Sequence, residues 1–159
     1  MDGFEINDAS VQFVSHHINA WEESQDVVVD VVTQPFDHRD YFLFLDRVLH
    51  HTETNSGSAK TLVKRIRIDL VTENVHVTDW PNKMNNPILN TFDYPTINPN
   101  KLGIKNQFVF GLASIDYWKQ TLIKKNLEDS DKDKTWSDAS TYPGEMVFIP
   151  NPGKKYVII

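Results

Sequence analysis

Residues 27–32 have the sequence Val-Val-Val-Asp-Val-Val, and this stretch sets the expected fold class. β-branched side chains favour extended backbone, and a nearly unbroken apolar run of this length is typical of a buried strand. Just before it, residues 11–15 alternate apolar and polar side chains and lead into residues 16–23, with a turn expected at residues 24–26. We therefore expect two consecutive strands joined by a tight turn.

The same patterns predict more short strands on the C-terminal side of this pair. Residues 62–70 alternate apolar with basic side chains, which is typical of a strand with one solvated face. Further short strands are expected at residues 75–78, 107–113, 120–124, 135–136 and 146–149. Many short strands separated by turns indicate an all-β fold, either a sandwich, a barrel or a propeller.

Two segments depart from this pattern. Residues 40–49 are the one predicted helix, because Asp40 can cap its N-terminus and apolar side chains recur at helical spacing after it. Residues 81–99 contain four prolines and are expected to form a long irregular connection. Connections of that length inside a compact domain are usually functional.

Composition excludes several classes of protein. The chain has 159 residues, a net charge of -6 and no cysteine, which argues against a nucleic-acid binder and excludes disulfides and thiolate metal sites. No stretch approaches the roughly 20 apolar residues that span a bilayer. The acidic N-terminus lacks the basic and apolar regions of a signal peptide. We expect a cytoplasmic protein, with peripheral membrane contact left open.

Three side chains are candidates for chemistry. His16 and His17 are adjacent on a predicted strand, so a metal in one cleft could take one of them and not both. Asp93 lies between two aromatic residues, where it could also be a turn-forming acid. Glu145 follows Tyr-Pro-Gly at the start of an apolar segment, where it could also be an exposed acid. Either carboxylate near a histidine would accept an imidazole N–H and orient the ring toward a metal.

Five segments in this order resemble the carotenoid oxygenase family. Residues 15–23, Ser-His-His-Ile-Asn-Ala-Trp-Glu-Glu, resemble the family segment that carries a ligand histidine. Residues 142–153, Tyr-Pro-Gly-Glu-Met-Val-Phe-Ile-Pro-Asn-Pro-Gly, resemble its Tyr-Pro-x-Glu segment. The other matching segments are Arg-Ile-Arg-Ile-Asp at 65–69, Phe-Asp-Tyr-Pro-Thr-Ile-Asn at 92–98 and Phe-Val-Phe-Gly at 108–111.

The resemblance implies a seven-bladed β-propeller with iron(II), Fe(2+), held on its axis by four histidines, three of which are oriented by glutamates. By position, His16 is then a metal ligand, His17 faces away, and Asp93 and Glu145 take the places of orienting carboxylates. Asp93 is one methylene shorter than the family's glutamate, so its hydrogen bond to a histidine is expected to be longer or mediated by water. Two ligands are expected upstream of the chain and one downstream of Ile159. Residues 1–159 are accordingly expected to be an incomplete C-terminal part of a single propeller domain, with about two blades.

The implied activity belongs to the whole protein. It is iron-dependent cleavage of one conjugated double bond of a carotenoid or apocarotenoid by dioxygen, with no residue of this chain required as nucleophile or general acid or base. The chain alone is expected to be inactive. Two alternatives stay open: a retinyl-ester isomerohydrolase of the same family, and a non-catalytic propeller fragment.

Overall fold

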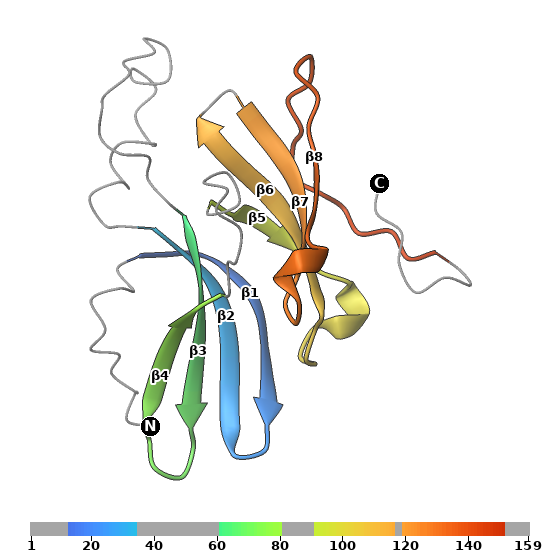
Figure 1. The fold of residues 1–159 in the computed structure, drawn as a ribbon. Helices are drawn as coiled ribbons and strands as arrows, with labels where there is room; N and C mark the ends of the chain where they lie inside the picture. The colour runs from blue at the N-terminus through green and yellow to red at the C-terminus, as the bar shows by residue number, and fades with distance from the viewer. Residues whose placement is uncertain (1–12, 35–60, 81–90, 117–118, 152–159) are drawn as a thin grey trace.

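The computed structural model describes residues 13–34, 61–80, 91–116 and 119–151, which form two four-stranded antiparallel sheets (Figure 1). The first sheet contains β1 (Phe13–Glu23), β2 (Asp26–Gln34), β3 (Leu62–Asp69) and β4 (Val75–Asp79), hydrogen-bonded in that order. The second sheet contains β5 (Asp93–Thr96), β6 (Phe108–Asp116), β7 (Lys119–Asn126) and β8 (Lys134–Trp136), also in chain order. Two short 3₁₀ turns, η3 (Pro99–Lys101) and η4 (Ser130–Lys132), lie between strands of the second sheet.

The predicted fold class is confirmed. Four-stranded antiparallel sheets in which consecutive strands are neighbours are the blades of a β-propeller, and the described residues contain two of them. The chain is therefore an all-β, partial propeller, and its described part does not close into a ring (Figure 1). The helix predicted at residues 40–49 lies outside the described residues.

Two predictions about local structure were wrong. The expected irregular connection at residues 81–99 contains β5, which is short and forms the edge of its sheet, where Pro95 removes no essential hydrogen bond. The strand expected at residues 146–149 is reduced to one bridging residue, Phe148. Its ring packs against Phe110 with a centroid separation of 5.9 Å, whereas Val147 beside it is 67% exposed.

Irregular pairing between β1 and β2 decides which side chains share a face. His16 is paired with Val32 and Asn19 with Asp30, and a register shift separates the two pairs. Paired residues lie on the same side of a sheet, and residues two apart on β2 share a face. The bulge therefore places His16 and Asn19 on one face of β1, although they are three residues apart.

The two sheets pack on a common apolar core. Trp80 and Phe92 lie at the contact, with ring centroids 6.0 Å apart. The buried cluster contains residues from both sheets and from the segments next to them, namely Ile18, Val32, Val63, Trp80, Phe92 and Val109. Burial of these side chains holds the sheets in the relative position that creates the site described next.

Candidate functional site

His16 and Asp93 meet at the junction of the two sheets. His16 is on β1 and Asp93 begins β5, and the imidazole Nε2 lies 3.2 Å from the carboxylate Oδ1. Both side chains remain partly open to solvent, with 39% of His16 and 24% of Asp93 exposed. The predicted proximity of these two residues is confirmed. His17, the neighbour of His16 on the strand, is exposed.

The backbone of β5 is distorted where it presents Asp93. Asp93 is paired with Leu112 and Thr96 with Phe110, so β5 carries one residue more than β6 between these pairs. Tyr94, inside this bulge, has a φ of 50°, in the left-handed region that non-glycine residues rarely adopt. The backbone N–H of Tyr94 donates to Asp93 Oδ1 at 2.9 Å. Such bulges re-aim a side chain, and here the affected carboxylate is the one that reaches His16.

Gly111 on β6 allows the close approach of β5. A Cβ atom at this position would lie 2.5 Å from Cζ of Phe92 and 2.7 Å from the carbonyl oxygen of Asp93. Both distances are well inside van der Waals contact, so any larger residue would displace the segment that carries Asp93. Glycine is required here for space, since its backbone needs no unusual φ.

The electrostatics of Asp93 reflect its half-buried position. Burial raises the pKa of Asp93 above its ordinary value, while the N–H of Tyr94 and the nearby His16 act in the opposite direction. A carboxylate that loses water is stabilised in its charged form by a hydrogen-bond donor or a positive charge. The imidazole of His16 and the backbone of β5 provide this stabilisation.

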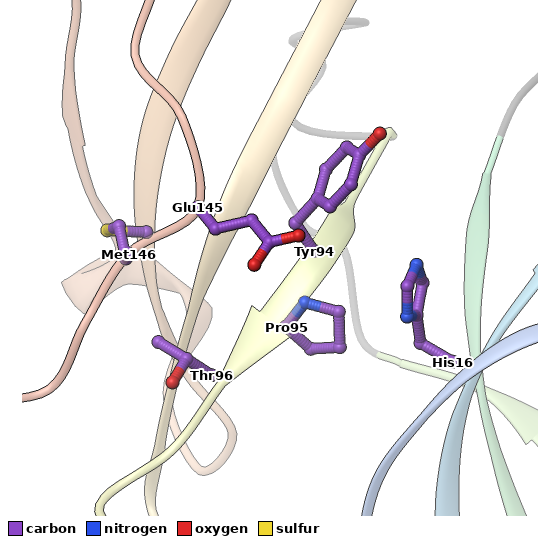
Figure 2. Close-up of a pocket in the computed structure, with 6 residues that line it drawn as sticks. All are labelled: His16, Tyr94, Pro95, Thr96, Glu145 and Met146. Carbon is purple, nitrogen blue, oxygen red and sulfur yellow. The ribbon is translucent and has the colours of Figure 1, made fainter.

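A small pocket opens beside this pair (Figure 2). It has a volume of about 150 Å³ and is lined by His16, Tyr94, Pro95, Thr96, Glu145 and Met146. Glu145 therefore lies on the same side as His16, as predicted, although it comes from the segment that follows β8. Sites for drug-sized ligands usually enclose about 300–1,000 Å³. The described residues thus form only part of the wall that a larger ligand would need.

His16 and Asp93 together fit one ligand position of a metal site, with His16 as the ligand and Asp93 as the carboxylate that orients it. An imidazole that donates one N–H to a carboxylate keeps its other nitrogen free as a lone-pair donor, which is how metal-binding histidines are usually oriented. Within residues 13–34, 61–80, 91–116 and 119–151, no group of three or more His, Cys, Asp or Glu side chains could hold a metal ion. A metal at His16 would therefore need ligands from outside these residues.

Several residues of this site were not identified from the sequence. The ring of Tyr94 lies 5.7 Å from that of His16, at an angle of 47°. A residue before proline normally favours extended backbone, so the left-handed conformation of Tyr94 could not be predicted. The pocket residues Pro95, Thr96 and Met146 carried no chemical signal of their own.

The sequence and the fold of this chain were compared with those of known proteins. The sequence model of the retinal pigment epithelial membrane protein family matches residues 4–156. The comparison with curated proteins found no match.

Among solved structures, a variant of Synechocystis apocarotenoid oxygenase superimposes with a TM-score of 0.63 and 21% identity, covering 91% of this chain and 29% of that chain. A cobalt-substituted form of the same Synechocystis protein gives identical values. A chimera of that oxygenase with the retinal pigment epithelial protein gives a TM-score of 0.64 at 21% identity, covering 90% of this chain and 28% of that chain. These likenesses show a shared fold, and the chain spans under a third of the length of each.

Proposed function

The chain belongs to the retinal pigment epithelial membrane protein family, and from this membership we propose that it is the C-terminal part of a single-propeller carotenoid-cleaving oxygenase. The proposed reaction is oxidative cleavage of one conjugated double bond of a carotenoid or apocarotenoid by dioxygen, in which each carbon of that bond becomes a carbonyl. The apocarotenoid oxygenase from Synechocystis has the same fold over 91% of this chain, which supports this class of reaction.

The observation that carries the proposal is the contact between His16 and Asp93. The imidazole Nε2 of His16 lies 3.2 Å from Asp93 Oδ1. In the proposed role Asp93 would accept the N–H on this nitrogen and orient the ring, so that the other ring nitrogen of His16 could bind a metal. Imidazole is a good ligand for iron and for other divalent metals. One of the solved relatives is described as cobalt-substituted, which supports a metal site in that protein.

We assign Glu145 a similar orienting role. It lines the same pocket as His16 and is exposed, so its carboxylate is open to a histidine from another part of the protein. Iron(II), when bound, would supply activation of dioxygen. The residues described here would hold one ligand in place, and none of them is needed as nucleophile or general acid or base.

A retinyl-ester isomerohydrolase is the second candidate. The family takes its description from a retinal pigment epithelial protein, and chimeras of that protein with the oxygenase share this fold. The two activities would use the same ligand histidine and differ in product, since the isomerohydrolase gives an alcohol and a fatty acid and the oxygenase gives two carbonyls. A non-catalytic propeller protein is the third candidate, because Asp93 is shorter than the family's glutamate.

The test is iron content together with product formation, in the full-length protein that carries this chain. His16→Ala should remove iron and activity. The matched control is His17→Ala, which should keep both, because the His17 side chain is exposed. Carbonyl products from a carotenoid would identify the oxygenase, and alcohol from a retinyl ester would identify the isomerohydrolase. Full iron in the His16 variant, or loss confined to the His17 variant, would show that the ligand is misassigned.

We also propose a cytoplasmic location with peripheral membrane contact, where apolar substrates dissolve. In the part of the chain that the structure describes, no helix is long and apolar enough to cross a membrane. The 159 residues alone provide one proposed ligand, so we expect the isolated chain to lack the activity.

A further inference from the structure

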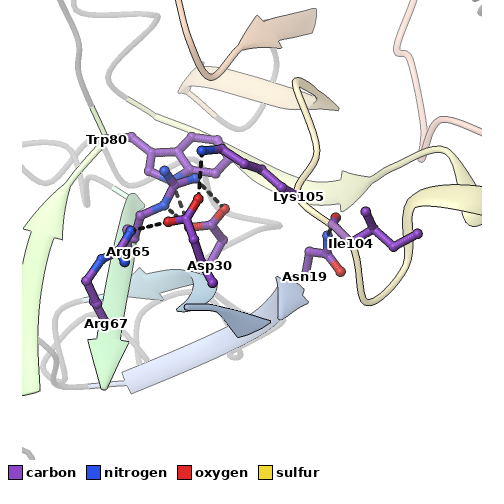
Figure 3. A network of polar contacts seen from close by, with 8 residues as sticks. Asn19, Asp30, Arg65, Arg67, Trp80, Ile104 and Lys105 are labelled. Atoms are coloured by element: carbon purple, nitrogen blue, oxygen red, sulfur yellow. Dashed lines mark hydrogen bonds and ion pairs between the residues drawn. The ribbon is translucent and has the colours of Figure 1, made fainter. Parts of the chain in front are cut away.

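Asn19 ties the two sheets together with three hydrogen bonds. Its Nδ2 donates to the carbonyl oxygens of Lys101 and Ile104, at 3.1 and 2.9 Å, and its Oδ1 accepts the N–H of Gly103 at 3.0 Å. The side chain leaves β1 toward the loop that carries Ile104 (Figure 3). Asn19 is only 5% exposed, and both N–H groups of its amide have a partner.

The loop held by Asn19 is the direct continuation of β5. It includes η3 and connects β5 to β6. Asn19 fixes the middle of this connection to β1, and Asp93 is the first residue of the strand that leads into it. His16 and Asn19 share one face of β1 because of the bulge between them. His16 and Asn19, which anchors the connection after β5, therefore belong to the same strand.

The ion pair between His16 and Asp93 is too weak to hold β1 and β5 in a fixed relative position. Both side chains are partly exposed, and exposed ion pairs contribute little to holding two segments together. A second tie, from Lys105 to Glu23 at 2.8 Å, involves side chains that are 57% and 33% exposed and is similarly weak. Buried hydrogen bonds from a side chain to backbone have a defined geometry and are costly to break, because the freed groups are left without water.

We propose that Asn19 is a positioning residue for the His16–Asp93 pair, acting through the loop of residues 101–104. This inference rests on the proposed function, because the His16–Asp93 pair matters to activity only if His16 binds a metal. Asn19 itself does not line the pocket.

If Asn19 had a purely structural role, its removal would lower stability without disturbing the His16–Asp93 pair. Asn126 provides the matched control for such a role. Asn126 is also a buried asparagine, 6% exposed, and its Oδ1 accepts the backbone N–H groups of Glu128 and Asp129 at 3.0 and 3.2 Å. Its loop follows β7 and does not line the pocket. Asn19→Ala and Asn126→Ala should both lower the thermal stability, while only the first should disturb the site.

The first measurement is hydrogen exchange of the metal-free, full-length protein. Asn19→Ala should increase exchange in residues 93–96 and 101–105, because the connection after β5 loses its tie to β1, and should leave residues 62–69 unchanged. Asn126→Ala should leave residues 93–96 as in the wild type. Unchanged exchange at residues 93–96 in the Asn19 variant, or an equal increase in the Asn126 variant, would overturn the proposal.

The second measurement is iron affinity in a double-mutant cycle. Asn19→Ala should weaken iron binding by about 10-fold, the lower end of what the loss of an orienting partner costs. In an Asp93→Ala background the same change should have little further effect, because the contact it maintains is already absent. An undiminished effect in that background would show that Asn19 does not act through Asp93. If the wild type binds no iron, the proposed function fails, and hydrogen exchange still decides the positioning role.

Discussion

Asp30 and Asp93 each face a nitrogen-bearing side chain, but the two carboxylates differ in burial and in the partners they have. Asp30, inside the first sheet, is 1% exposed, and Arg65 on β3 binds it through two hydrogen bonds of 2.8 and 2.9 Å (Figure 3). The indole N–H of Trp80 adds a third at 3.3 Å. Asp93, between the sheets, is 24% exposed; its Oδ1 lies 3.2 Å from His16 Nε2 and accepts the backbone N–H of Tyr94 at 2.9 Å.

The difference separates a structural ion pair from an accessible one. The oxygens of Asp30 are buried and accept hydrogen bonds from Arg65 on β3 and from Trp80, which directly follows β4. Asp93 lies next to Tyr94, whose φ is 50°, and it is paired with His16, which lines a pocket. Strained backbone next to a partly open titratable pair is typical of functional sites. Charge pairing is therefore common to both carboxylates, whereas solvent exposure and a strained neighbouring residue distinguish Asp93 from Asp30.

The largest effect should follow from neutralising each carboxylate in turn. Asp30→Asn leaves Arg65 without its counter-charge inside the protein, and breaking a buried pair in this way typically costs about 3–5 kcal/mol. Asp93→Asn should change the free energy of unfolding little, because burial already raises the pKa of Asp93 and disfavours its charged form. Denaturant unfolding of both variants measures the difference. Equal losses of stability would contradict the contrast between the two carboxylates.

The second-largest loss of stability should follow from a larger side chain at Gly111, next to Asp93. Gly111→Ala places a methyl group 2.5 Å from the ring of Phe92, and overpacking of this kind costs about 1–3 kcal/mol. Because the methyl group also meets the carbonyl of Asp93, the distance between Asp93 and His16 should increase. Denaturant unfolding and a crystal structure of the variant would check both effects. Gly144→Ala is the control, since nothing lies within 4 Å of a Cβ at that position.

Removal of the Asp93 side chain should weaken metal binding more than it lowers the stability of the fold. In the full-length protein, Asp93→Ala should weaken iron binding by about 10–100-fold, as expected when a ligand histidine loses the group that orients it. Asp93→Glu, which restores the family's residue, should bind iron at least as well as the wild type. Metal titration with a competing chelator measures both. Unchanged affinity in the alanine variant would remove the main support for the proposed site.

The smallest effect concerns acid stability at the exposed edge of the first sheet. Lys105 and Arg67 donate to Glu23 and lower its pKa from an ordinary value of 4.5 to about 2. A lowered pKa means that the contribution of Glu23 is present above pH 4.5 and is lost as the pH falls toward 2. The wild type should therefore be slightly more stable than Glu23→Gln at neutral pH, and the two should converge in acid. A difference that persists at pH 2 and in high salt would exclude this cause.

The strands were largely predictable because their signals are local. The valine run of residues 27–32 lies in β2, and the alternating segment of residues 62–70 forms β3. Both were predictable because a strand buried on one or both faces shows this burial in the order of its apolar and polar residues. β5 was not predicted, because a four-residue edge strand containing Pro95 is too short and too irregular to show a period. The quoted motifs identified the family for the same local reason, and the family model matches nearly the whole chain.

The sequence by itself thus determined the fold class, the family, and His16, Asp93 and Glu145 as candidates. Only the tertiary structure showed that His16 and Asp93 lie within 3.2 Å, that Tyr94 takes a left-handed conformation, and that Asn19 fastens the loop after β5. Each of these features joins residues from different sheets or depends on a bulge in strand pairing. Periodicity reports which face of a strand is buried, and it carries no information about which distant segment covers that face.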